Sequence, residues 1–198
     1  MTRKQQISPW VRQLGRSQLA IAERWRHRAA ASSDCFARFY FGFTGFNALF
    51  FFWAEAERYQ AEAHRRPVER EQIEWLIRTF STKDSSHALA DAQEAVRYFS
   101  ERRAIQRMDR RQAENPHDGD PMEGGRLKEA LADTHAPAKD RLVALARIIY
   151  LVRNNLVHGS KLESGDDEEV VEHAAKGLMA ILDHAIPHTS GRLGVAPA

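Results

Sequence analysis

Sixteen consecutive residues without a charge, from Phe39 to Ala54, constrain the fold more than any other segment of this sequence. Aromatic side chains dominate the segment, so it avoids water either inside a protein core or inside a membrane. As a helix it would be about 24 Å long at ~1.5 Å per residue, which is short of the ~30 Å hydrocarbon layer of a bilayer. Arg38 precedes it and Glu55 follows it. We therefore expect a buried helix at the centre of the fold rather than a transmembrane span.

Helical patterns fill most of the chain, and no stretch shows the sustained alternation of apolar and polar residues that is typical of a β-strand. Apolar residues recur at three- and four-residue intervals, and Ser8 followed by Pro9 is typical of a helix start. We predict an all-α helical bundle in which Pro187 ends the last helix. Helices are expected over 8–30, 35–64, 68–80, 87–111, 138–158 and 166–186.

The length of 198 residues fits a single domain, which we place at residues 1–188. Turn-forming pairs such as Asn115-Pro116 and Gly124-Gly125 crowd residues 112–137, which we predict to be a flexible insertion that contains a short helix over 126–133. Residues 189–198 are expected to form a flexible tail.

The cysteine and charge content exclude several classes of protein. Cys35 is the one cysteine, so the chain can form neither an intramolecular disulfide nor a cysteine-based zinc site. A net charge of +2 is too small to indicate nucleic-acid binding by itself. No apolar signal core follows the basic residues 1–6, so we expect a cytoplasmic protein without a membrane anchor. We also expect neither a metal nor a cofactor.

The most informative polar residues lie near the end of the predicted helix over 138–158, within the string Tyr-Leu-Val-Arg-Asn-Asn-Leu-Val-His-Gly-Ser-Lys at 150–161. Asn154 and His158 are four residues apart, so they share one face of a helix. Arg153 lies roughly 140° away from His158 around the helix axis, at ~100° per residue, but its long side chain can reach the same edge. We expect these three residues to form a polar edge at the C-terminus of the helix.

This arrangement resembles the motif of the HEPN (higher eukaryotes and prokaryotes nucleotide-binding) domains. Arg153 and His158 enclose four residues, and Asn154 fills the polar place of that motif. The longer string is most similar to the Apea-like HEPN subfamily, and Phe-Asn-Ala-Leu-Phe at 46–50 resembles an upstream segment of the same subfamily. The resemblance covers less than half of the chain, and residues 66–137 match nothing comparable.

The resemblance implies a HEPN-like bundle and a metal-independent endoribonuclease that acts as a homodimer on RNA, as a toxin or an antiviral effector. It implies His158 as the general base or acid, Arg153 as the phosphate ligand and Asn154 as the residue that orients them. Lys161 and Tyr150 are expected to contact the substrate as well. A histidine suits proton transfer near neutral pH, and an arginine fork suits a phosphate on which charge accumulates.

Three other interpretations remain open. The same edge could belong to a non-catalytic module that binds RNA, a nucleotide or a protein partner in a defence or toxin–antitoxin complex, or to a structural subunit of such a complex. An arginine-rich run over 97–111 could follow RNA, although such runs more often form a solvated face. The histidines at 173, 184 and 188 have no spacing typical of a metal site.

Overall fold

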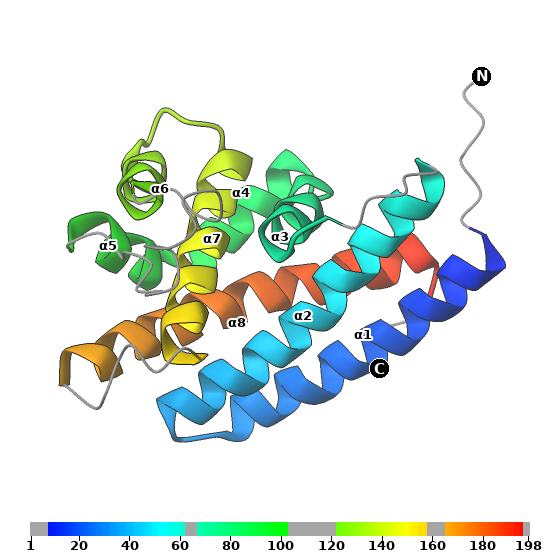
Figure 1. The fold of residues 1–198 in the computed structure, drawn as a ribbon, viewed down its shortest axis with the longest axis horizontal. Coiled ribbons are helices and arrows are strands. Elements are labelled where there is room, and N and C mark those ends of the chain that lie inside the picture. Colours follow the sequence, from blue (N-terminus) through cyan, green and yellow to red (C-terminus); the bar gives the residue numbers. More distant parts are fainter. Residues whose placement is uncertain (1–7, 62–66, 103–121, 158–164, 196–198) are drawn as a thin grey trace, which may run out of the picture.

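A computed structural model of the chain describes residues 8–61, 67–102, 122–157 and 165–195. Within these ranges every regular element is an α-helix, which confirms that the protein is all-α there (Figure 1). The helices are α1 (Pro9–Ala31), α2 (Cys35–Gln60), α3 (Glu69–Arg78), α4 (Thr82–Asp91), α5 (Gln93–Glu101), α6 (Glu123–Ala132), α7 (Ala138–Val157) and α8 (Gly165–Leu193).

The charge-free segment forms the middle of α2, and it is buried as predicted. Phe46 and Leu49 are inaccessible to solvent, because α1 lies alongside α2 and α8 crosses both (Figure 1). The expected start of α1 is confirmed, since Ser8 accepts a hydrogen bond from the backbone of Val11. Among the helices that the structure describes, none combines the length and the hydropathy that a membrane span requires.

Helix α8 continues to Leu193, so the prediction that Pro187 ends it is wrong, and residues 189–193 of the predicted tail are helical. A proline inside a helix costs ~3 kcal/mol locally. Tertiary contacts offset that cost here: Thr189 is buried and accepts a 3.1 Å hydrogen bond from Nε1 of Trp53. Leu193 packs so closely on Gly15 of α1 that a Cβ at position 15 would lie 2.7 Å from its Cδ2 atom.

The segment over 82–101 also differs from the prediction, because it forms two helices instead of one that starts at 87. Ser81 and Asp84 form a reciprocal cap at the start of α4. The polar residues 81–86, which separate the predicted helices over 68–80 and 87–111, therefore start a helix. The part of the predicted insertion from residue 122 onward contains α6, which packs on α5 and α7 through the buried Leu131. The remainder of that insertion lies outside the described residues.

Helix α7 crosses the middle of the molecule and contacts α3, α4, α6 and α8 (Figure 1). The apolar residues that repeat along it at three- and four-residue steps are buried from Leu142 to Val152, but the burial extends around most of its circumference. Arg147 lies in the middle of this buried length, and its guanidinium pairs with Glu74 of α3 and Glu123 of α6. A buried charge needs such partners, because burial without them carries a large desolvation cost.

Candidate functional site

Arg153 lies on the last full turn of α7, with its side chain 31% exposed and held by three contacts. Its Nη1 atom donates a 3.0 Å hydrogen bond to Oδ1 of Asn154 and lies 3.6 Å from Oε2 of Glu69 on α3. Its guanidinium carbon lies 5.5 Å from the centre of the Phe43 ring on α2, within the range of a cation–π contact. The guanidinium is therefore positioned by two other helices while part of it stays open to solvent.

Asn154 does not lie on an exposed polar edge, which corrects the prediction for this residue. Its side chain is only 4% exposed, and the neighbouring Asn155 is buried as well. The reason is that neighbouring helices cover α7 on most sides, so the face of α7 that carries Asn154 lies in the interior. The side-chain oxygen Oδ1 of Asn154 accepts the hydrogen bond from Arg153, so this buried amide helps to orient the guanidinium.

Two of the predicted site residues, His158 and Lys161, lie outside the described residues, and their roles stay predictions. Helix α7 is described as far as Val157, whose side chain is 58% exposed. Tyr150 is half-buried one turn before Arg153 and packs against the core.

Phe43 links Arg153 to the helix that carries the upstream match, although Phe43 itself lies outside that match. Phe43 contacts Arg153, and its ring centre lies 6.1 Å from that of Phe46, the first residue of the upstream match. Phe50, the last residue of that match, lies 6.3 Å from Phe43. The contact between α7 and the aromatic segment of α2 is therefore made by the Arg153 side chain on the Phe43 ring.

Glu69 is a residue of this site that sequence reasoning missed. It is in the first turn of α3, where an acidic residue is expected for the helix dipole alone. Its proximity to Arg153 depends on how α3 packs against α7, and no spacing in the sequence signals that contact. The carboxylate partly neutralises the guanidinium and would compete with an incoming phosphate.

The other polar features that the sequence offered are separated in the fold. His173 stacks on Tyr98, His184 pairs with Asp91, and His188 lies against Thr79, so the three histidines of α8 do not meet. No group of metal-binding side chains occurs in the part of the chain that the structure describes. From the arginine-rich run, residue 97 is exposed and residue 102 lies over the Tyr98 ring, while the residues from 103 onward are outside the described ranges.

The environment of His188 makes the stability of the fold depend on pH. Burial between Trp53 and Phe80 lowers the pKa of His188 below its ordinary 6.5, and nearby Arg192 adds to this shift, while Asp84 opposes it. The unfolded chain therefore binds a proton more readily than the folded one in this range. We expect the free energy of unfolding to decrease as the pH falls through 6.5 and below.

The variant His188→Gln tests this dependence, because an amide can still donate to Thr79 but does not titrate. Urea unfolding between pH 7.5 and 5 should show a weaker dependence on pH in the variant than in the wild type. Burial lowers the pKa of His173 as well, so part of the dependence should remain. An identical pH dependence in the two proteins would contradict the role of His188.

The chain matches no known protein family, and no curated protein or solved structure is detectably similar to it. The chemistry of the site is therefore judged from its residues. A half-exposed guanidinium with a fixed orientation at a helix end can bind a phosphate or a carboxylate. Proton transfer would require a second group, for which His158 is the predicted candidate.

Proposed function

We propose that this protein is a metal-independent endoribonuclease of the HEPN type that acts as a homodimer. The observation that carries the proposal is the position of Arg153, which stands at the end of α7 above the aromatic segment of α2. Phe43, which contacts Arg153, packs on Phe46 of the upstream stretch that resembles the same subfamily, and this supports the proposal. A role as a toxin or an antiviral effector follows from the resemblance alone.

The proposed reaction needs no protein nucleophile and no metal. The 2′-hydroxyl of the RNA attacks the adjacent phosphorus, and the bond to the 5′-oxygen of the next nucleotide breaks. A histidine takes the proton from the 2′-hydroxyl, and a second histidine gives a proton to the departing 5′-oxygen. The products are a 2′,3′-cyclic phosphate and a 5′-hydroxyl. Arg153 stabilises the charge that accumulates on the phosphate, Asn154 fixes the direction of its guanidinium, and Lys161 and Tyr150 are further candidate contacts.

A dimer supplies the second histidine, since each chain would contribute one His158. Exposed apolar side chains lie one helical turn from the Arg153–Phe43 contact on each helix: Val157 on α7 is 58% exposed and Tyr40 on α2 is 65% exposed. Apolar residues that surround a polar centre are typical of an interface between protein chains. We therefore place the dimer interface around the end of α7.

Val157→Asp should weaken the dimer by roughly tenfold or more, because it would place two carboxylates in an apolar contact. Light scattering over a range of protein concentrations measures the change. Met122→Asp is the matched control, since Met122 is equally exposed at the start of α6. A wild-type protein that stays strictly monomeric at high concentration would contradict the dimer.

The direct test of the activity is cleavage of a single-stranded RNA in the presence of EDTA. We expect the wild-type protein to cut the RNA, to leave a 2′,3′-cyclic phosphate and to spare a DNA strand of the same sequence, which lacks the attacking hydroxyl. Cleavage that EDTA abolishes, or cleavage of the DNA, would contradict the mechanism. RNA binding without cleavage would support the alternative of a non-catalytic HEPN module, which the existing pairing of Arg153 with Glu69 also favours.

A further inference from the structure

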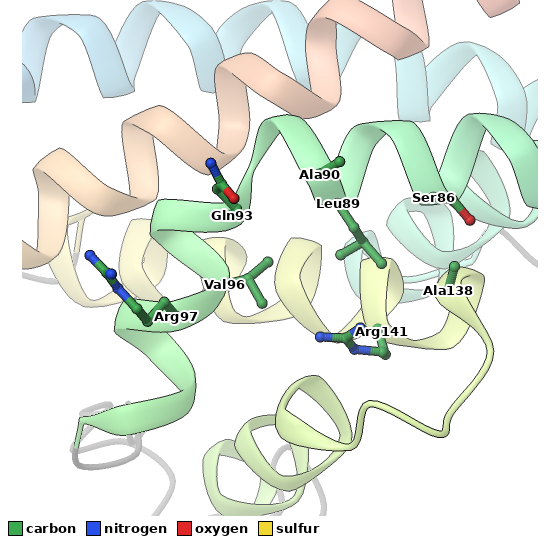
Figure 2. A pocket seen from close by; sticks show the side chains of 8 residues that line it. All are labelled: Ser86, Leu89, Ala90, Gln93, Val96, Arg97, Ala138 and Arg141. Carbon is green, nitrogen blue, oxygen red and sulfur yellow. The ribbon is translucent and has the colours of Figure 1, made fainter.

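A groove between α4, α5 and the start of α7 contains two arginines, Arg97 and Arg141, that form no ion pair with a side chain of the described residues. It has a volume of about 370 Å³ and is lined by Ser86, Leu89, Ala90, Gln93, Val96, Arg97, Ala138 and Arg141 (Figure 2). Its size falls within the range of pockets that bind small molecules. The groove adjoins the first turn of α7, whereas Arg153 lies on the last, so it is a feature distinct from the candidate nuclease site.

Neither arginine of the groove pairs with an acidic side chain of the described chain. Five others, namely Arg26, Arg58, Arg78, Arg147 and Arg153, each pair with a carboxylate. The nearby acids are already engaged: Glu94 pairs with Lys176 at 2.9 Å, and Asp140 lies 3.6 Å from Arg78. Arg97 still feels the nearby carboxylate of Glu94, whose pKa is lowered mainly by Lys176 and further by Arg97, but neither guanidinium of the groove is held by a direct ion pair with a described residue.

Arg141 is held in place for such a role. Its Nε atom donates a 3.0 Å hydrogen bond to the backbone oxygen of Leu131, which anchors the guanidinium by one edge. The side chain extends from α7 toward Val96 across the groove (Figure 2). The Nη groups make no hydrogen bond or ion pair with a described residue, so they remain free to donate to an anion.

Arg97 lies at the rim, exposed, with its guanidinium directed away from Arg141 (Figure 2). Because no direct ion pair with a described residue holds it, the site proposed below requires only that this exposed side chain turn about its own bonds toward the groove. The start of α7 at Ala138 adds the positive end of a helix dipole. Between these charges, the half-buried Val96 and the small exposed part of Leu89, which is 8% exposed, provide an apolar surface that a simple inorganic ion would not use.

We propose that this groove binds a small organic phosphate, a phosphomonoester attached to an apolar or ring-shaped body. The phosphate lies between the guanidinium groups of Arg97 and Arg141, where each can donate two parallel hydrogen bonds. The body lies on Leu89 and Val96. This site goes beyond the nuclease proposal and does not depend on it.

Phenyl phosphate is the probe, since it combines one phosphate with one flat apolar ring. Calorimetric titration of the full chain at low ionic strength should give a dissociation constant of roughly millimolar, as expected for a ligand of this size. Inorganic phosphate lacks the ring and phenol lacks the charge, so both should bind several times more weakly. Equal affinity for inorganic phosphate, or no binding of phenyl phosphate, would overturn the proposal.

Arg97→Ala should weaken binding by about tenfold, because it removes one charged contact, and Gln93→Glu should do the same by placing a carboxylate in the groove. Both residues are exposed, so the variants should fold normally. Arg12→Ala on α1 is the control, an exposed helical arginine without an ion pair in the described chain. If Arg12→Ala weakens binding as much as Arg97→Ala, the effect comes from net charge and the site is wrong.

Discussion

The variant Arg153→Ala is expected to cleave RNA at least ~100-fold more slowly than the wild type, with little change in stability. Removing one group that stabilises charge in a transition state costs about 10²–10³ in rate. The side chain is 31% exposed and its ion pair with Glu69 is solvated, so the fold loses little. Single-turnover cleavage of a labelled RNA measures the rate, and urea unfolding measures the stability.

Glu69→Gln distinguishes a phosphate ligand from a simple structural pair. If Arg153 existed to hold α7 against α3, removing either partner of the pair would have the same effect. In the nuclease the carboxylate competes with the phosphate, so Glu69→Gln should keep the activity or raise it roughly two- to fivefold, in line with the strength of an exposed pair. Equal losses in the two variants would leave Arg153 with a structural role only.

His158→Ala is a further test of the same centre. It should reduce the cleavage rate roughly 10²–10⁴-fold, as expected for the loss of a general acid or base. Two matched controls accompany these variants. Arg26→Ala removes an arginine of similar exposure that pairs with Asp183, and His27→Ala removes an exposed histidine of α1. Both controls should cleave RNA at the wild-type rate, and a loss in either would mean that the assay reports folding.

Local signals predicted the individual helices well because these signals act within a few residues. Ser8 and Pro9 start α1 as expected, and the charge-free segment of α2 is buried because no surface could accommodate it. The same local reasoning ended α8 at Pro187. The helix continues for six further residues because Trp53 donates a hydrogen bond to Thr189 and Leu193 packs on Gly15. These contacts join distant parts of the chain, so local signals do not predict them.

The candidate site shows the same division. The motif placed Arg153 near a helix end, and the structure has it there, half-exposed. Asn154 was expected on a polar edge because it shares a helix face with His158, whereas neighbouring helices cover most of α7 and bury it. Glu69 could not be assigned to the site at all, because its contact with Arg153 is created by the packing of α3.

The ion-pair network around Arg147 should be the most sensitive polar position of the fold. Its side chain is 13% exposed, and that of its partner Glu123 is 12% exposed. Arg147→Met keeps the length and the apolar stem of the side chain but leaves the carboxylate of Glu123 buried without a cation. Breaking a buried pair in this way costs about 3–5 kcal/mol, so we expect a loss of roughly 3 kcal/mol in the free energy of unfolding.

The double variant Arg147→Met with Glu123→Leu separates the buried charge from the packing. Apolar residues of similar volume can replace a buried ion pair with little loss, so the double variant should recover most of the stability that the single variant loses. Glu74 needs no replacement, because it is 29% exposed and water can solvate its carboxylate. Arg78→Met is the matched control: its pair with Asp140 is half-exposed on both sides, and urea unfolding should show little or no change. Additive losses in the double variant would mean that the two side chains act independently and that α6 is not held to α7 by this charge pair.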